Sequence, residues 1–219
     1  TSKCNLLCIL LTNLTNPGTD DAILSLLHLN TSRGVEKGHY VKALLDKFEN
    51  ECPSEEKWLL YIVLNISGST RVSPIILSNK PFLEYIANKL HNKQFTDEKF
   101  ELAAKVVRNL SLQRSSTNDA HGILIETNIA DAVMRGLEEC SLTPICTVLT
   151  EVLYFLCTSK ESIEWMESIN GKQILNNILD TKSHPINDKM CEPAKAIVND
   201  KLLTILDDIQ DITVTGDGL

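Results

Sequence analysis

Residues Trp58 to Ser67 read WLLYIVLNIS, an apolar stretch that closes on Asn-Ile-Ser. Related phrases occur at Leu6 to Thr15 (LLCILLTNLT), at Glu101 to Ser111 (ELAAKVVRNLS) and at Val148 to Thr158 (VLTEVLYFLCT). The apolar residues in each phrase follow the spacing of a helix that buries one side. A similar helix that returns after about 40 to 50 residues is typical of armadillo and HEAT repeats. The four phrases therefore predict an all-α repeat protein.

The segments between the phrases predict shorter helices, separated by strong turn signals such as Asn16-Pro17-Gly18. A long helix, a short helix and a medium helix follow one another, which favours armadillo over the two-helix HEAT repeat. We expect an armadillo-like α-solenoid of about four to five repeats that form a right-handed superhelix. A single domain of residues 1–207 would hold the repeats, and residues 208–219 would form a flexible acidic tail. The expected repeats span roughly residues 1–52, 53–95, 96–143 and 144–207.

Capping residues suggest where several helices begin. Ser54 is expected to cap the second long helix and the run Thr96-Asp97-Glu98 the third, and Thr158 to Glu161 match the Ser/Thr-x-x-Glu capping box. Asp20-Asp21 precede Ala22 to Leu29, a short apolar stretch that predicts a further helix.

Composition narrows the class of partner. A net charge of −8 without a basic run argues against binding to nucleic acid. No apolar run reaches the roughly 20 residues that a membrane span requires. The 7 cysteines form no Cys-x-x-Cys motif, and three of the Asn-x-Ser/Thr sequons coincide with the repeat phrase. We therefore expect a cytoplasmic protein without nucleic-acid or membrane contacts. Because the chain opens inside a repeat helix, we also expect further N-terminal repeats to be missing from it.

The sequence contains no motif for catalysis, cofactor binding or metal binding. The 5 histidines lie far apart, no His-Glu-x-x-His occurs, and no Cys/His quartet has zinc spacing. Gly-rich phosphate loops and Gly-x-Ser-x-Gly are also absent from the sequence. Acidic pairs such as Glu55-Glu56 lie at expected helix starts, where solvation and the helix dipole account for them. We therefore expect a non-enzymatic protein with no catalytic residue, no cofactor and no metal.

Asn13, Asn65 and Asn109 hold the same position in three repeat phrases, and Phe155 replaces them in the fourth. An unsatisfied buried amide costs about 1–3 kcal/mol, so a recurrent Asn in a burying helix needs a partner. In armadillo proteins this position lies on the third helix and can hold the backbone of an extended peptide. Alternatively, each Asn ties down the adjacent inter-repeat loop by satisfying carbonyls at the helix end.

Helical spacing places further side chains beside these asparagines. The candidate groove residues are Asn13, Tyr61, Asn65, Lys105, Arg108, Asn109 and Tyr154. Positive charge from Lys105 and Arg108 on an acidic protein would favour an acidic partner segment. The alternative is that both are ordinary solvated residues.

Six phrases follow one another along the chain: Leu10 to Thr15, Leu64 to Ser67, Arg71 to Lys80 with Ile76-Leu77, Val107 to Leu110, Leu149 to Leu153 and Cys191-Glu192. Their order resembles that of the Hgh family, small cytosolic armadillo-repeat proteins. The chain departs from the family at Arg108 to Ser111, where members usually read Arg-Asn-Cys-Cys, and it lacks their long acidic insertion before the fourth long helix.

The resemblance implies a folding chaperone or adaptor for translation elongation factor 2, working alongside the general chaperone machinery. Two other functions fit the same repeat pattern. One is an armadillo-type nucleotide exchange factor or cochaperone for Hsp70, and the other is a generic armadillo peptide-binding adaptor.

Overall fold

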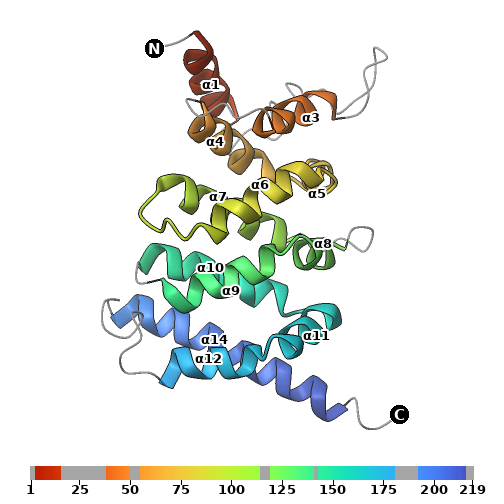
Figure 1. The fold of residues 1–219 in the computed structure, drawn as a ribbon, viewed down its shortest axis with the longest axis vertical. Coiled ribbons are helices and arrows are strands. Elements are labelled where there is room, and N and C mark those ends of the chain that lie inside the picture. The colour runs from red at the N-terminus through yellow and green to blue at the C-terminus, as the bar shows by residue number, and fades with distance from the viewer. Residues whose placement is uncertain are drawn as a thin grey trace. The chain divides into compact units, whose positions relative to one another are not determined.

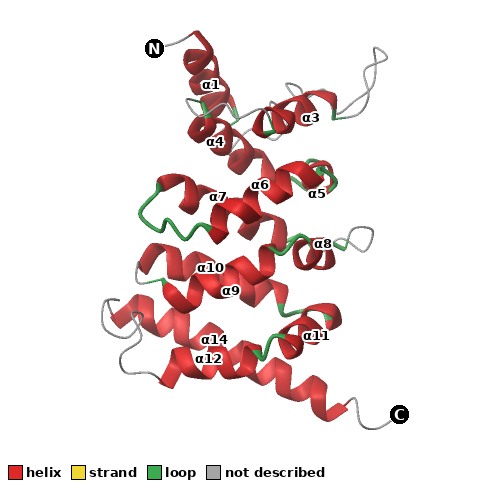
Figure 2. Ribbon diagram, in the orientation of Figure 1, coloured by secondary structure: helices red, strands yellow, loops and turns green. Residues whose placement is uncertain are grey.

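The computed structural model describes residues 3–15, 38–49, 55–113, 119–140, 143–180 and 192–215. Within these ranges all regular secondary structure is helical (Figure 2). The contacts group the chain into two compact units, Thr1–Ala120 and His121–Leu219. This division falls inside the third expected repeat.

In the first unit, α4 lies against α1 on one side and α7 on the other, and α6 packs on α7 (Figure 1). The helices of this unit are α1 (Lys3–Leu14), α3 (His39–Leu45), the 3-10 turn η1 (Asp46–Phe48), α4 (Glu56–Ser67), α5 (Ser73–Leu77), α6 (Lys80–His91) and α7 (Glu98–Ser111). Leu60, Phe82 and Phe100 are fully buried between these helices. The apolar sides of the phrases on α4 and α7 therefore build the core of this unit, as the helical spacing predicts, whereas Leu10 and Leu14 of the first phrase are exposed.

In the second unit, α10 packs against α9 and α14, and α12 packs against α11 and α14. Its helices are α8 (Ala120–Glu126), α9 (Ile129–Glu139), α10 (Thr143–Leu156), α11 (Lys160–Ser168), α12 (Gly171–Asp180) and α14 (Glu192–Thr215). Val152 and Leu156 on α10 and Leu202 on α14 are fully buried. Among the described residues, no helix is both long and apolar enough to cross a membrane.

Two expected helix ends need correction. The cap of α11 is Ser159, whose hydroxyl accepts a hydrogen bond from the Ser162 amide at 3.2 Å, whereas the Thr158 hydroxyl donates back to the Phe155 carbonyl. The second correction concerns the end of α14. We expect a flexible tail from residue 208, but α14 continues to Thr215, because Ile209 extends the row of buried apolar residues on this helix. The expected helix at Ala22 to Leu29 and the expected cap at Ser54 lie outside the described residues.

Gly38 begins α3 in the left-handed region, with a φ of 80°. A Cβ at this position would lie 2.5 Å from Cδ1 of Ile75. Left-handed backbone costs a non-glycine residue about 1–2 kcal/mol, and the contact adds to this cost. We expect Gly38→Ala to lower the free energy of unfolding by about 2 kcal/mol in urea denaturation.

The matched control for Gly38 is Gly68→Ala at the end of α4. Gly68 has a φ of −73°, and the nearest atom to an added Cβ would be 3.9 Å away. This change should leave stability unchanged or raise it slightly, because alanine restricts the unfolded chain. Equal effects of the two substitutions would contradict the account of Gly38.

Candidate functional site

Two of the recurrent asparagines join neighbouring long helices. Asn65 on α4 donates its amide hydrogens to the carbonyl of Thr12 at 3.0 Å and to the hydroxyl of Thr15 at 3.3 Å, both at the end of α1. Asn109 on α7 repeats the arrangement at the end of α4. It donates to the carbonyl of Leu64 at 3.2 Å and to the hydroxyl of Ser67 at 2.9 Å. We call these two sets of contacts the asparagine ladder.

The Ser/Thr of each Asn-x-Ser/Thr phrase completes the ladder. The Thr15 hydroxyl donates to the Leu11 carbonyl at 2.8 Å, and the Ser67 hydroxyl donates to the Leu64 carbonyl at 2.8 Å. Because the hydroxyl hydrogen is used within its own helix, the oxygen lone pairs can accept from the next Asn. Each phrase therefore has two roles. Its Asn donates hydrogen bonds to the preceding long helix, and its hydroxyl accepts a hydrogen bond from the Asn of the following long helix.

The ladder bears on the two interpretations of the asparagines. Both amide hydrogens of Asn65 and of Asn109 are used between helices, which supports the role in holding a helix end. Among the described residues, no donor bonds to the side-chain oxygen of Asn65 or Asn109. A partner could therefore bond to these two side chains only by donating a hydrogen to their oxygens.

A mixed aromatic and charged surface lies beside the ladder. It comprises Trp58 and Tyr61 on α4 with Glu98, Lys105 and Arg108 on α7, and we call it the long-helix face. All of these side chains are half-buried except Glu98, which is exposed. The rings of Trp58 and Tyr61 are 6.0 Å apart, and the Tyr61 hydroxyl donates to Glu98 Oε1 at 2.6 Å. These contacts bring the first turns of α4 and α7 together.

Ion pairs balance the positive charge that the sequence places here. Lys57 Nζ lies 2.6 Å from Glu98 Oε2, and Lys105 Nζ lies 2.6 Å from Glu101 Oε1. The hydrogen bonds from Lys57 and then from Tyr61 lower the pKa of Glu98. The bond to Glu98, followed by burial, raises the pKa of Tyr61 to about 12. The long-helix face is therefore mixed in charge at neutral pH.

The predicted groove residues do not all share one unit. Tyr61, Asn65, Lys105, Arg108 and Asn109 lie on adjacent helices of the first unit, α4 and α7. Asn13 lies on α1 and is exposed. Tyr154 lies on α10 of the second unit, where the Lys201 ammonium stands 5.8 Å from its ring centre.

Trp58 and Glu98 belong to the long-helix face but are not among the groove residues predicted from the sequence. Trp58 could have been found from its place three residues before Tyr61, which puts both rings on one side of the helix.

The Glu56 carboxylate joins three helices of the first unit. It accepts from Lys89 on α6 at 2.7 Å, from Lys99 on α7 at 2.5 Å and from the Tyr85 hydroxyl on α6 at 2.5 Å. Burial alone would raise the pKa of Glu56, but the bonds from Lys89, Lys99 and Tyr85 outweigh it and lower the pKa to about 2. The expectation that this acidic residue is simply solvated at a helix start is wrong, because only 15% of its side chain is exposed.

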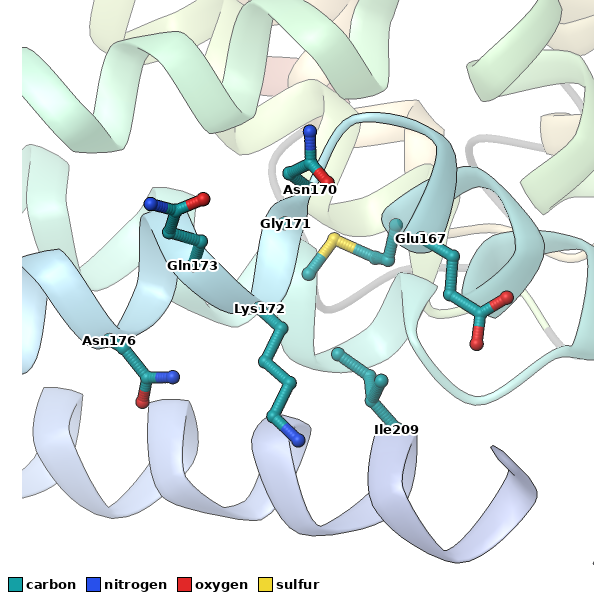
Figure 3. Close-up of a pocket in the computed structure, with 8 residues that line it drawn as sticks. Glu167, Asn170, Gly171, Lys172, Gln173, Asn176 and Ile209 are labelled. Carbon is teal, nitrogen blue, oxygen red and sulfur yellow. The ribbon is translucent and has the colours of Figure 1, made fainter. Parts of the chain in front are cut away.

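Two hollows are lined by residues that do not belong to the long-helix face. One, of about 570 Å³, opens beside Glu56 and is lined by residues including Phe48, Tyr85 and Lys89. The other, of about 460 Å³, lies at the turn between α11 and α12 (Figure 3). In Figure 3 the polar ends of Glu167, Lys172 and Gln173 point in different directions. Small-molecule sites usually bring a few polar groups to one point, and this hollow does not.

The described residues hold no group of three or more His, Cys, Asp or Glu placed to bind a metal ion. Cys140, Cys146 and Cys157 are buried thiols. Burial, followed by the charge of Asp208, raises the pKa of Cys157 to about 12, so its thiol stays protonated at neutral pH.

Comparison with known proteins adds information about the fold only. No protein-family model matches the chain, and no curated protein matches it. Among solved structures, the chain is similar to an engineered protein whose crystal structure was determined by the Northeast Structural Genomics Consortium. The TM-score is 0.64 at 15% sequence identity, and the match covers 93% of this chain and 73% of the other.

Proposed function

We propose that the chain is a non-enzymatic, cytoplasmic protein-binding scaffold, an armadillo-like α-solenoid that holds a partner segment on the long-helix face. The observation that carries the proposal is that the partly exposed, mixed surface of the long-helix face lies on helices that are joined by specific contacts. Asn109 and Glu56 connect α7 to α4 through bonds between distant parts of the chain. A surface that is already ordered loses little conformational entropy on binding, so more of the contact energy appears as affinity.

The residue types of the long-helix face support this proposal. Trp, Tyr and Arg are the side chains most enriched at energetically important positions of protein interfaces, and Trp58, Tyr61 and Arg108 provide all three. The charges of Lys105 and Glu98 would set the orientation of a partner segment that carries both signs. The proposed client is translation elongation factor 2, which the resemblance to the Hgh family suggests.

The test is binding of purified elongation factor 2 to the immobilised full chain and to Lys105→Glu. The charge reversal should weaken binding about tenfold, which corresponds to about 1.4 kcal/mol. Lys105 forms only a half-buried ion pair with Glu101 one turn away, so the fold should remain intact by circular dichroism.

The matched control is Lys80→Glu on α6, because Lys80 also pairs with a glutamate one turn away, Glu84. This variant should bind elongation factor 2 as the unmodified chain does. Absence of binding to the unmodified chain would contradict the proposed client. Equal binding by the two variants would contradict the proposed face.

A further inference from the structure

The second unit carries an aromatic and charged surface where its two long helices, α10 and α14, pack together. The ring centres of Tyr154 and Phe155 on α10 lie 5.6 Å apart, and both side chains are half-buried. The ammonium of Lys201 on α14 stands 5.8 Å from the centre of the Tyr154 ring. The same Nζ lies 2.9 Å from Oε1 of Glu151 on α10. Two rings and an ion pair between the helices therefore lie side by side.

This surface has the same components as the long-helix face of the first unit. There the two rings belong to Trp58 and Tyr61, and Lys57 Nζ stands 5.6 Å from the centre of the Trp58 ring. Lys57 also forms its ion pair with Glu98 on the neighbouring long helix. Aromatic side chains of this kind are enriched at the energetically important positions of protein interfaces. Each unit therefore presents one such surface on a pair of packed long helices.

The surface of the second unit differs from the long-helix face in charge. No Lys or Arg occurs in α10, and Lys201 is paired with Glu151. Asp208 follows Lys201 by seven positions, about two turns, so both lie on the same side of α14. Asp208 is exposed, its charge acts on Cys157 at the end of α10, and it has no ion-pair partner among the described residues. A carboxylate without a counter-charge therefore lies near the two rings.

We propose that this surface binds a partner segment in which basic residues flank large apolar residues. We call it the α10/α14 face, and it comprises Glu151, Tyr154, Phe155, Lys201 and Asp208. The apolar side chains of the segment pack on the rings of Tyr154 and Phe155. A lysine or arginine of the segment pairs with Asp208, which supplies the charge complementarity. Lys201 does not neutralise Asp208, because its ammonium is held by Glu151.

The charge requirement separates the α10/α14 face from the long-helix face. Lys105 and Arg108 add positive charge to the long-helix face, which disfavours a basic segment there. The two faces also lie on different units of the chain. Binding to the α10/α14 face therefore does not depend on the proposed client of the long-helix face.

The test uses a fluorescein-labelled peptide of sequence Gly-Ser-Lys-Leu-Phe-Lys-Ser-Gly, titrated with the full chain and followed by anisotropy. A second peptide, with glutamate in place of both lysines, measures the charge requirement. We expect saturable binding of the basic peptide, with the acidic peptide at least about tenfold weaker. Asp208→Lys and Phe155→Ala should each weaken binding of the basic peptide about tenfold, because one reverses the pairing charge and the other removes a ring.

Each variant has a matched control in the first unit. Glu84→Lys makes a similar change of charge at an exposed position of α6, and Trp58→Ala removes a ring from the long-helix face. Both should bind the basic peptide as the unmodified chain does. Because Asp208 is exposed, Asp208→Lys should keep its helix content by circular dichroism.

Three results would overturn the proposal. The first is that the unmodified chain binds neither peptide, or binds both equally. The second is that Asp208→Lys binds the basic peptide unchanged, or that Glu84→Lys loses binding to the same extent, since the attraction would then be non-specific. The third is self-association of the unmodified chain in sedimentation that Asp208→Lys abolishes, which would assign the face to a second copy.

Discussion

Glu56→Gln is expected to lower the free energy of unfolding by about 3 kcal/mol at pH 7. A carboxyl whose pKa falls from 4.5 to about 2 on folding stabilises the folded state by about this amount once it is ionised. The substitution also leaves Lys89 and Lys99 beside each other without the carboxylate that both contact. Urea denaturation of the two proteins gives the difference directly.

The pH dependence provides a second readout for Glu56. Because its pKa is lower in the folded state, the unfolded chain binds the proton more tightly between about pH 5 and pH 2. The stabilisation is therefore complete above about pH 5 and is lost as the pH falls toward 2. The difference in stability between the unmodified chain and Glu56→Gln should shrink over the same interval.

Glu84→Gln on α6 is the control for this prediction. The Glu84 side chain is 59% exposed and lies 3.9 Å from Lys80, so its removal should change stability by less than about 0.5 kcal/mol. If Glu56→Gln had a similarly small effect, or an effect that did not depend on pH, the central position given to Glu56 would be wrong.

Asn109→Ala is expected to lower the free energy of unfolding by about 2 kcal/mol. It removes both hydrogen bonds to the end of α4 and leaves the Leu64 carbonyl without its cross-helix donor. In a background that already carries Ser67→Ala, the cost of Asn109→Ala should be smaller, because one of the two bonds is gone. Urea denaturation of the four proteins of this cycle measures the coupling.

Asn13→Ala is the natural comparison, because Asn13 is exposed and has the same place in the repeat phrase. It should change the stability of the isolated chain by less than about 0.5 kcal/mol. If Asn109→Ala were equally harmless to stability but abolished partner binding, Asn109 would belong to the groove rather than to the ladder.

The helices could be predicted well from the sequence because their signals are local. Glu101 to Ser111 has an apolar period and follows the expected capping run Thr96-Asp97-Glu98, and the structure places α7 at Glu98–Ser111 with Asp97 as its cap. The capping box predicted at Thr158 was wrong by one residue. The Thr158 hydroxyl bonds to the preceding helix end, and Ser159 caps α11 instead.

The candidate site was less predictable because its contacts join distant residues. The recurrence of Asn65 and Asn109 is visible in the sequence, but the helix that receives each amide is not. Glu56 bonds to Tyr85 and Lys99, which lie 29 and 43 residues later in the chain. The residues next to Glu56 in the sequence therefore give no indication of this ion pair. In the same way, the charge of Lys105 could be read from the sequence, whereas the carboxylates around it depend on how α4 and α7 pack.

Hydrogen–deuterium exchange of the full chain, with and without saturating elongation factor 2, tests the proposed binding face most directly. Bound partner should slow exchange in peptides from residues 56–67 and 98–111, which carry the long-helix face. The start of α6, which carries the exposed residues Lys80 and Glu84, does not belong to that face and should exchange at the same rate in both samples. Unchanged exchange in α4 and α7 under saturating partner would contradict the account.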